Sequence, residues 1–448
     1  MVVGGGIAGL TAAYELGADR EVLILEGSHD VGGRLRRAEV AGVAVDVGAE
    51  AMLSRRPEGV DLLRDLGLSV VHPASTSSAV WSRGSLRRLP RTLLGVPLDL
   101  DDLRESCVLS DAGLARVLEE PGLPASDVTD DRTVASLVAE RLGEEVVERL
   151  VEPLLGGVYA GHAGLLSAAA TTPQLVALAR RGSLVEAAAE LPTSDVPVFA
   201  GVPGGLGTVP AALADSGRFE VMTSAAVRGL TRTRGGGFAL TVGSAHDPRR
   251  VEAEAVVLAC PAAPAARLLA EVAPVASAEL ATIESASVAI VTHAFRADDL
   301  GELSGTTGSG FLVPPVEGRA IKAATYSFAK WAWVRDAGAG LLLLRTSVGR
   351  HREEAPLQQP DEALVAESVA ELAALADVAA PPVASHVQRW GGALPQYAVG
   401  HLDRVARIRA DVASVPGLAV CGAAYDGVGI PAVIGSARRA VASLSRAE

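Results

Sequence analysis

The spacing of apolar and polar positions changes three times within the first thirty residues. Apolar residues at 2–3 predict the end of a strand, helical spacing over 7–16 predicts a helix, and EVLILE at 21–26 predicts a buried parallel strand. The order strand, helix, strand indicates a β-α-β unit. Because the strand before Gly4 is only three residues long, we expect the natural chain to begin upstream of Met1.

Other parts of the chain have different patterns. Short runs of β-like sequence lie within 218–259, namely FEVM, FALTV and VEAEAVVLA. Helical spacing dominates 101–195, whereas 262–385 mixes helices with longer strands such as SVAIVTHAF and GLLLLRTSV. Near the end of the chain, LAVCGA predicts another strand and 430–444 another helix.

These patterns predict an α/β (α+β) fold in three parts. The simplest arrangement is a discontinuous Rossmann-like dinucleotide-binding domain, interrupted by a mixed-sheet substrate domain and a helical inserted domain. The expected boundaries are 1–75, 196–261 and 386–448 for the dinucleotide-binding domain, 76–100 and 262–385 for the substrate domain, and 101–195 for the helical domain. A length of 448 residues agrees with about three domains.

Composition and charge exclude several classes of function. Forty basic against 53 acidic residues give a net charge of −13, the wrong sign for binding a phosphate backbone, and only 3% of residues are aromatic. We therefore expect no nucleic-acid partner. Three widely spaced cysteines predict neither a disulfide framework nor a metal site. No apolar stretch reaches the roughly 20 residues of a spanning helix, so we expect a cytoplasmic protein, at most peripheral to a membrane.

A glycine turn follows the first strand. GGGIAG places Gly4, Gly6 and Gly9 at the GxGxxG spacing, directly after a strand and at the start of a helix. Gly4 permits the tight turn, Gly6 lets the backbone approach a pyrophosphate, and Gly9 allows close packing of helix on strand. The helix N-terminus offers free N–H groups to the anion. Glu26 ends the second strand, where its carboxylate can accept from ribose hydroxyls and disfavours the 2′-phosphate of NADP.

Three further glycine-containing segments indicate FAD rather than NAD. VGGRL at 31–35 brings Arg34 near the diphosphate, and DVGAE at 46–50 supplies a turn that can face a flavin. CGAAYDGVGIPAVIG combines a strand, a glycine loop and a helix, whose N–H groups at 428–430 can stabilise the negative charge of a reduced flavin. The simpler alternatives are a surface arginine that caps a loop and an ordinary C-terminal helix.

These glycine turns together resemble the flavin amine oxidase superfamily over nearly the whole chain. VEPLLGGVYAG, PGGLGTVPAAL, IKAATYSFAKW and RWGGALPQYAVGH are similar to strings of the protoporphyrinogen/coproporphyrinogen oxidase family. The resemblance implies a discontinuous FAD/NAD(P)-binding Rossmann-like domain, a mixed-sheet substrate domain and a membrane-associated helical domain. The FAD contacts that it implies are Gly4, Gly5, Gly6, Ile7, Ala8, Gly9, Glu26, Gly27, Gly33, Arg34, Val47, Gly48, Ala49, Glu50, Val227, Trp390, Gly422, Val428, Gly429 and Ile430.

The resemblance also implies a reaction. The substrate would be a porphyrinogen, whose meso CH₂ bridges give hydride to flavin N5. Six electrons would leave in three cycles, and molecular oxygen would take them up as hydrogen peroxide. We assign no catalytic residue and no metal, because the flavin carries the chemistry. The residues expected at the substrate are Gly157, Val158, Tyr159, Lys330 and Arg345, with Lys322, Arg55 and Arg56 as further propionate anchors and His401 as a weak candidate.

One departure from the family bears on the choice of substrate. Ser78 stands where mitochondrial-type enzymes carry an arginine, which argues against a two-propionate clamp. Arg83, Arg87 and Arg88 lie nearby and suit a four-propionate substrate, so the resemblance favours coproporphyrinogen III over protoporphyrinogen IX. A flavin amine oxidase or desaturase and a non-catalytic flavin-binding protein are the alternatives. Peripheral membrane contact and a haem-pathway enzyme partner are also consistent with the resemblance.

Overall fold

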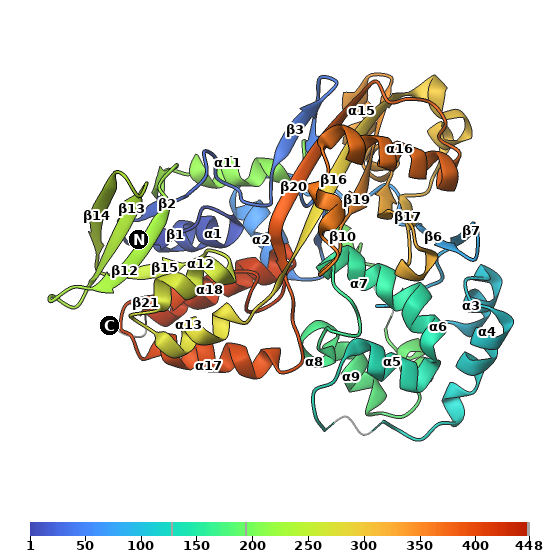
Figure 1. Cartoon of the computed structure of the whole chain (residues 1–448), viewed down its shortest axis with the longest axis horizontal. Helices are drawn as coiled ribbons and strands as arrows, with labels where there is room; N and C mark the ends of the chain where they lie inside the picture. Colours follow the sequence, from blue (N-terminus) through green and yellow to red (C-terminus); the bar gives the residue numbers. More distant parts are fainter. Residues whose placement is uncertain (127–128, 193–194, 446–448) are drawn as a thin grey trace.

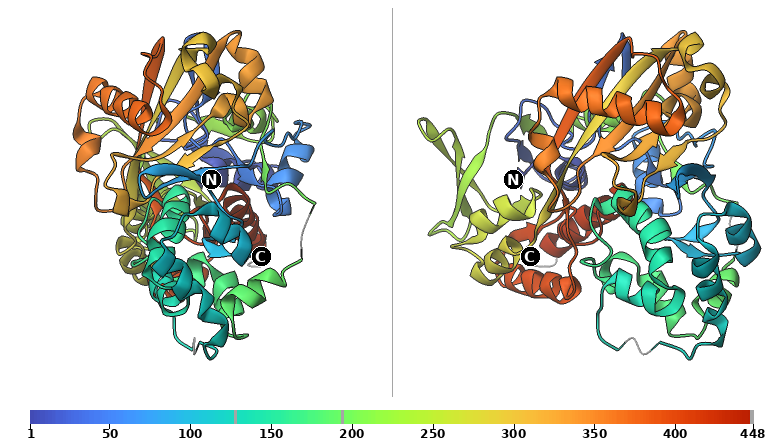
Figure 2. Two further views of the ribbon diagram at one scale, coloured as in Figure 1. Left: turned by 90° about the vertical axis from the view of Figure 1, so that its right-hand side faces the viewer. Right: turned by 45° about the vertical axis from the view of Figure 1, so that its right-hand side comes forward.

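The computed structural model describes residues 1–126, 129–192 and 195–445. Its elements gather in three regions (Figure 1): a parallel sheet with flanking helices, a larger sheet with long strands, and a group of short helices. Figure 2 shows the same regions from two further sides, with both chain termini in or beside the first region. Each region contains its own buried apolar cluster.

The first region is built on five parallel strands from distant parts of the chain. Their order is β11 (Glu220–Met222), β2 (Leu23–Leu25), β1 (Val2–Val3), β15 (Val256–Leu258) and β21 (Leu418–Val420). Alternate strand residues face opposite ways and both faces are covered, which is why strands such as VVL and LAV are apolar throughout. One face packs on α1 (Ile7–Leu16) and α18 (Ile430–Ser445), and the other on α12 (Ala262–Leu269), α13 (Pro274–Ala281) and α17 (His401–Ala413).

An antiparallel three-stranded sheet projects from this region. It consists of β12 (Val227–Arg232), β13 (Phe238–Gly243) and β14 (Pro248–Ala253). The run VEAEAVVLA is divided between two sheets, because its first half ends β14 and its second half forms β15. The β14 half alternates partly exposed with exposed positions, whereas β15 is fully buried. A single β-like run in the sequence therefore contributes strands to two different sheets.

The second region is a mixed sheet of seven strands. Their order is β20 (Ala384–Pro395), β16 (Ser285–Arg296), β19 (Leu341–Val348), β18 (Ile321–Thr325), β17 (Gly310–Leu312), β6 (Ala79–Ser82) and β7 (Ser85–Arg88). The β17–β6 pair is parallel and the other neighbours are antiparallel. Helix α16 (Asp361–Ala376) covers one face, with α14 (Ser327–Lys330) and α15 (Ala332–Gly338) beside β19. The expected boundary at residue 386 falls inside β20, and the domain division remains a prediction.

The third region is helical, as the spacing over 101–195 predicts. Its elements are α3 (Leu100–Ser106), α4 (Asp111–Leu118), η1 (Glu120–Gly122), α5 (Val134–Leu142), α6 (Glu144–Val146), η2 (Val147–Val151), α7 (Glu152–Tyr159), α8 (Ala168–Thr171), α9 (Pro173–Ala179) and α10 (Leu184–Ala189). A buried ion pair between Glu120 and Arg141 joins η1 to α5. Among the described residues, every helix is too short or too polar to cross a membrane.

The remaining elements are short. They are β3 (Arg37–Val40), β4 (Val43–Asp46), β5 (Met52–Leu53), α2 (Pro57–Asp65), β8 (Thr92–Leu93), β9 (Val96–Pro97), β10 (Phe199–Ala200), η3 (Leu206–Thr208), α11 (Val209–Ala214), η4 (Ala297–Gly305), η5 (Pro315–Glu317) and η6 (Ala355–Gln358). The turn after β4 and the long strand β20 are the two connections that meet at the candidate site.

Candidate functional site

The glycines of the first turn have different physical roles. Gly4 has φ +106°, a backbone conformation that side chains disfavour, and a Cβ there would lie 2.9 Å from the Ala259 carbonyl oxygen. A Cβ on Gly9 would lie 1.9 Å from the Gly4 carbonyl oxygen, so Gly9 permits close packing of α1 on the turn. A Cβ on Gly6 would meet no heavy atom within 4 Å. The backbone at Gly6, which caps α1, therefore faces open space that can take a pyrophosphate.

Glu26 holds this turn through hydrogen bonds. Its Oε2 accepts from the Gly5 N–H at 2.5 Å, and its Oε1 accepts from the Ser28 N–H and hydroxyl, both at 2.7 Å. A carboxylate offers about four acceptor positions, so one more is available for a ribose hydroxyl. The acid at the end of β2 thus supports the turn whether or not it also binds a ribose, and its cofactor contact remains a prediction.

The VGGRL segment lies directly against the first turn. Gly32 donates its N–H to the Gly5 carbonyl oxygen at 2.7 Å, and a Cβ on Gly33 would come within 3.2 Å of the Gly6 Cα. Arg34 donates to the Gly392 carbonyl oxygen on β20 at 3.1 Å, and burial lowers the pKa of its guanidinium. The structure therefore brings together the first two predicted glycine turns, with Arg34 reaching the second sheet.

Trp390 fixes the turn after β4. Its indole Nε1 donates to the Val47 carbonyl oxygen at 3.0 Å. A Cβ on Gly48 would lie 2.0 Å from the Arg34 carbonyl oxygen and 3.2 Å from the Trp390 ring, so only glycine fits between them. Two predicted FAD contacts, one on the turn and one on β20, are thus neighbours.

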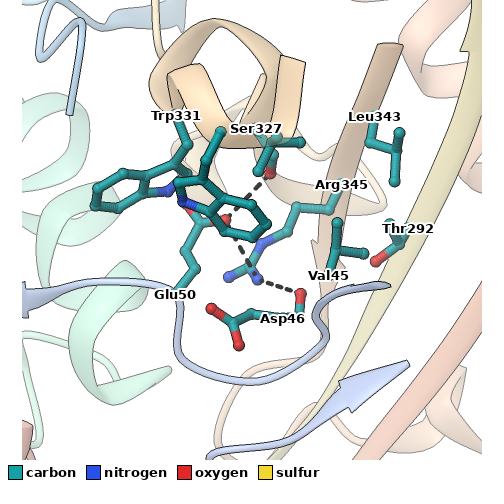
Figure 3. Close-up of a pocket in the computed structure, with 10 residues that line it drawn as sticks. Val45, Asp46, Glu50, Thr292, Ser327, Trp331, Leu343 and Arg345 are labelled. Carbon is teal, nitrogen blue, oxygen red and sulfur yellow. Dashed lines mark hydrogen bonds and ion pairs between the residues drawn. The ribbon is translucent and has the colours of Figure 1, made fainter. Parts of the chain in front are cut away.

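Glu50 ends this turn inside a cluster of opposite charges. Its carboxylate lies 2.7 Å from the Lys330 Nζ. It also lies 3.5 Å from the Arg345 Nη1 and accepts from the Ser327 hydroxyl at 3.1 Å, and Figure 3 shows these last two partners. Arg345 also donates to the carbonyl oxygens of Asp46 and Gly48, at 3.2 and 3.0 Å. A cavity of about 10 Å³, room for roughly one water molecule, adjoins the cluster.

The two cations of the cluster stabilise the ionised form of Glu50 against the cost of burial. Burial alone disfavours the ionised form of Glu50, but Arg345 and Lys330 outweigh it and lower the pKa of Glu50 to about 2. The side chains of Lys330 and Arg345 are only 17% and 13% exposed. The prediction that they bind substrate carboxylates remains untested, but both already have a carboxylate partner in the chain. Lys330 lies on the short helix α14 and not on a strand.

Asp46 supports the candidate site through hydrogen bonds, although the sequence patterns did not single it out. Its two carboxylate oxygens accept the N–H groups of Leu206 and Gly207, each at 2.8 Å, and so hold the PGGLG turn beside β4. Burial raises the pKa of Asp46 to about 6, although these N–H groups oppose the shift. The sequence does show an acid at the start of DVGAE. It does not show the hydrogen-bond partner of this acid, because Leu206 lies 160 positions away.

The C-terminal glycine loop leads from β21 into α18. Gly422 has φ +126°, and Cys421 before it is fully buried, as expected for a small core residue. A Cβ on Gly429 would meet no heavy atom within 4 Å, so the backbone before α18 also faces open space. The first turn of α18 can direct N–H groups toward a ligand there.

A separate hollow lies at Val227, one of the expected FAD contacts. It has a volume of about 280 Å³ and is lined by Ala226, Val227, Arg228, Pro264, Arg267 and Leu268. Ala226 in turn lies against Gly27, which follows Glu26 at the end of β2. Open backbone at Gly6 and Gly429 and this hollow beside Gly27 together fit an extended flavin dinucleotide.

The predicted substrate residues at the end of α7 differ in exposure. Gly157 and Val158 are exposed, whereas Tyr159 is buried. A Cβ on Gly157 would meet nothing within 4 Å. The main chain of Ala160 accepts from the His351 N–H at 2.7 Å, which ties the end of α7 to the loop after β19. Exposed backbone of this kind leaves room for a flat apolar ligand.

Most of the other basic candidates already bond within the chain. Arg55, Arg83 and Arg87 donate to main-chain carbonyl oxygens, whereas Arg56 pairs with Glu58 and Arg88 with Asp102. His401 begins α17, is fully buried and stacks on Tyr397 with ring centroids 3.9 Å apart. Burial lowers the pKa of His401 to about 4, so it is neutral near pH 7.

Lys322 and Arg350 form a different kind of basic pair. Lys322 donates to the Gly349 carbonyl oxygen and Arg350 to the Val313 carbonyl oxygen, each at 2.9 Å, and both side chains are buried. Burial, with Arg350 adding to it, lowers the pKa of Lys322 to about 7. Arg350 was not among the predicted anchors. Its sequence neighbours, Gly349 and His351, do not indicate that its side chain is buried.

Comparison with known proteins finds relatives that match this chain over nearly its full length. Residues 7–445 match the family described as flavin containing amine oxidoreductase. The protein named coproporphyrinogen III oxidase in Mycobacterium tuberculosis is 38% identical over 462 residues, covering 100% of this chain and 97% of that protein. The protein of the same name in Bacillus subtilis is 29% identical over 466 residues, covering 98% and 96%. A crystal structure from Exiguobacterium sp. 255-15, assigned as a protoporphyrinogen oxidase, superposes with a TM-score of 0.88 at 29% identity, covering 100% and 98%.

Proposed function

Because the chain belongs to the flavin-containing amine oxidoreductase family and its cofactor is FAD, we propose that it is an oxygen-using coproporphyrinogen III oxidase. It would convert coproporphyrinogen III to coproporphyrin III by removing six electrons, as a step of haem biosynthesis. The observation that carries the proposal is the similarity to the Mycobacterium tuberculosis protein of that name, which extends over the whole of this chain. The open backbone at Gly6 and Gly429 supports the cofactor that this reaction needs.

The residues of the chain would bind and orient the two reactants. When bound, FAD accepts hydride from the macrocycle at N5 and passes the electron pairs to molecular oxygen, which yields hydrogen peroxide. The N-terminus of α1 at Gly6 would hold the pyrophosphate, and the hollow at Val227 would hold the adenine. The N–H groups at 428–430 would stabilise negative charge at the ring edge. We assign no side chain to proton transfer.

The macrocycle would lie against the exposed end of α7. Gly157 and Val158 offer a flat apolar surface there. Lys330 and Arg345 are paired with Glu50, so we favour Lys322 and Arg350 as partners of substrate carboxylates. Each is bonded to a main-chain carbonyl oxygen, and neither forms a direct ion pair among the described residues. A carboxylate would neutralise charge that burial otherwise makes costly.

A panel of substrates tests the proposal. The FAD-loaded protein is mixed in air with coproporphyrinogen III, protoporphyrinogen IX or a polyamine, and porphyrin fluorescence and hydrogen peroxide are recorded. We expect fluorescence with coproporphyrinogen III at a rate well above its spontaneous oxidation. Polyamine turnover without porphyrin formation would show a flavin amine oxidase instead. Bound FAD with no turnover of any substrate would show a non-catalytic flavin protein.

Protoporphyrinogen IX is the second candidate substrate. The Exiguobacterium structure, with its TM-score of 0.88, carries an assignment to that activity. We favour coproporphyrinogen III because Ser78 replaces the arginine that the two-propionate substrate would use. Peripheral membrane contact and a haem-pathway enzyme partner belong to the same proposal, and flotation with vesicles would test the first.

A further inference from the structure

We propose that Tyr397 is a positioning residue that fixes the flavin-facing loop at 421–429 and relates it to the substrate end of α7. The inference rests on the proposed placement of the flavin ring at the N-terminus of α18. Tyr397 lies in the PQYAVGH segment that follows β20, and no cofactor or substrate contact was expected of it.

The hydroxyl of Tyr397 bridges two parts of this loop. It donates to the Ala423 carbonyl oxygen and accepts from the Gly427 N–H at 2.9 Å. A hydroxyl has one proton to donate, so its donor capacity is fully used. Gly427 has φ +128°, and a Cβ there would lie 2.9 Å from the Ala432 Cβ, which places the turn tightly against the start of α18. The Tyr397 hydroxyl therefore sets where the turn before α18 lies.

The ring of Tyr397 faces the substrate side. Its centroid lies 5.6 Å from that of Tyr159, at an interplanar angle of 60°. Tyr159 is the last residue of α7 and follows the exposed Gly157 and Val158. The neighbouring Gln396 donates its Nε2 to the Tyr159 carbonyl oxygen at 2.8 Å. One short segment thus contacts the end of α7 through a ring and an amide, and the flavin-facing loop through a hydroxyl.

A second ring also packs against Tyr397. The imidazole of His401 stacks on Tyr397 with centroids 3.9 Å apart and planes 11° from parallel. Asp131 of the helical region accepts the Gly400 N–H at 2.9 Å, and Ser167 donates its N–H to the Tyr397 carbonyl oxygen at 2.7 Å. Tyr397 is buried between these groups and has little freedom to move. A buried ring held by two aromatic neighbours can transmit a fixed position to its hydroxyl.

A second tyrosine in the same loop provides a matched control. Tyr425 is also buried, but its hydroxyl has no hydrogen-bond partner among the described residues. Removal of that hydroxyl leaves the loop's hydrogen bonds unchanged, whereas removal of the Tyr397 hydroxyl leaves a carbonyl and an N–H without their partner. Each Tyr→Phe substitution removes one buried hydroxyl, but only the Tyr397 hydroxyl is hydrogen-bonded within the part of the chain that the structure describes.

The test compares Tyr397→Phe with Tyr425→Phe in the FAD-loaded full chain. For Tyr397→Phe we expect roughly a tenfold weaker FAD dissociation constant, a more negative flavin reduction potential and an altered visible flavin spectrum. With coproporphyrinogen III as substrate, kcat should fall and KM should change little. Tyr425→Phe should match the wild type in potential and spectrum. Near-UV circular dichroism and urea unfolding confirm that both variants are folded.

A third variant separates this inference from the proposed cofactor placement. Gly429→Ala adds a methyl group that meets no protein atom, so it should weaken FAD binding only if the ring lies there. Weaker binding in Gly429→Ala together with an unchanged potential and spectrum in Tyr397→Phe would overturn the role of Tyr397 alone. An equal shift in Tyr425→Phe would also overturn it. Unchanged FAD binding in Gly429→Ala would refute the placement on which the inference rests.

Discussion

The ammonium of Lys330 lies 2.7 Å from a carboxylate oxygen of Glu50, although 280 positions separate the two residues. The pair joins α14, beside the seven-stranded sheet, to the turn that follows β4. The same turn is held by Trp390 from β20. The seven-stranded sheet and the candidate flavin site are therefore connected by charge as well as by packing.

Removal of the Lys330 charge should destabilise the protein. Lys330→Met leaves Glu50 buried with Arg345 as its remaining cation, and we expect a loss of about 2 kcal/mol in the free energy of unfolding at pH 7. Because the folded pKa of Glu50 is about 2, below its ordinary value, its stabilisation is present above about pH 4.5 and fades as the pH falls toward 2. Urea unfolding of both single variants and of Lys330→Met/Glu50→Gln measures the coupling.

An exposed ion pair gives the control for that cycle. Arg64 and Asp61 lie 3.4 Å apart on α2, with side chains 71% and 48% exposed, and Arg64→Met should cost less than about 1 kcal/mol. Additive effects of the Lys330 and Glu50 substitutions would contradict the account. A raised KM for the porphyrinogen in Lys330→Met, at unchanged stability, would instead support Lys330 as a substrate anchor.

Gly6→Ala should separate cofactor binding from folding. The new methyl group meets no protein atom and the backbone φ of −74° suits alanine, so the stability of the cofactor-free protein should hold. FAD binding should weaken by roughly tenfold or more, because the methyl group projects into the space expected for the pyrophosphate. Titration with FAD, followed by quenching of flavin fluorescence, measures the effect.

Two other glycine substitutions are controls for Gly6→Ala. Gly9→Ala should impair folding itself, since its methyl group would lie 1.9 Å from the Gly4 carbonyl oxygen. Gly305→Ala, far along the chain in η4, should affect neither property, because a Cβ there meets nothing within 4 Å. Wild-type FAD affinity in Gly6→Ala would mean that the pyrophosphate lies elsewhere.

Asp46 should make stability depend on pH. Burial raises its folded pKa to about 6, above its ordinary value near 4, so the folded state binds the proton more tightly than the unfolded state. The stabilisation from this proton is present below about pH 4 and is lost as the pH rises through 6. Relative to Asp46→Asn, the wild type should therefore lose up to about 3 kcal/mol over that range.

Unfolding curves at several pH values measure this difference. The Asn variant also loses one acceptor for the N–H groups of Leu206 and Gly207, but that cost does not vary with pH. The slope of the difference is therefore the informative quantity. A difference that stays constant from pH 4 to 7 would show that Asp46 keeps an ordinary pKa.

Local patterns in the sequence were sufficient for the nucleotide-binding elements. The GxGxxG turn, the helix that begins at Ile7 and the buried strand that ends before Glu26 all depend on residues within one β-α-β unit. The glycine spacing also indicated FAD, which the family match confirms. Short-range periodicity carries this information because each residue's partners lie a few positions away.

Contacts between distant segments could not be predicted in the same way. Nothing near Lys330 in the sequence indicates Glu50 as its partner, and nothing near Asp46 indicates the N–H groups at 206–207. The change of sheet within VEAEAVVLA was also hidden, because both halves are β-like. These contacts depend on the order of the strands in the folded sheets. That order is determined by packing between distant segments rather than by local sequence spacing.

The stoichiometry of a single reaction tests the central claim most directly. FAD-loaded protein is mixed with coproporphyrinogen III in air, and coproporphyrin III and hydrogen peroxide are quantified against an enzyme-free control. Six electrons removed in pairs predict three molecules of peroxide for each porphyrin, formed much faster than in the control. Porphyrin that appears no faster than in the control, from protein whose FAD is fully bound, would contradict the account.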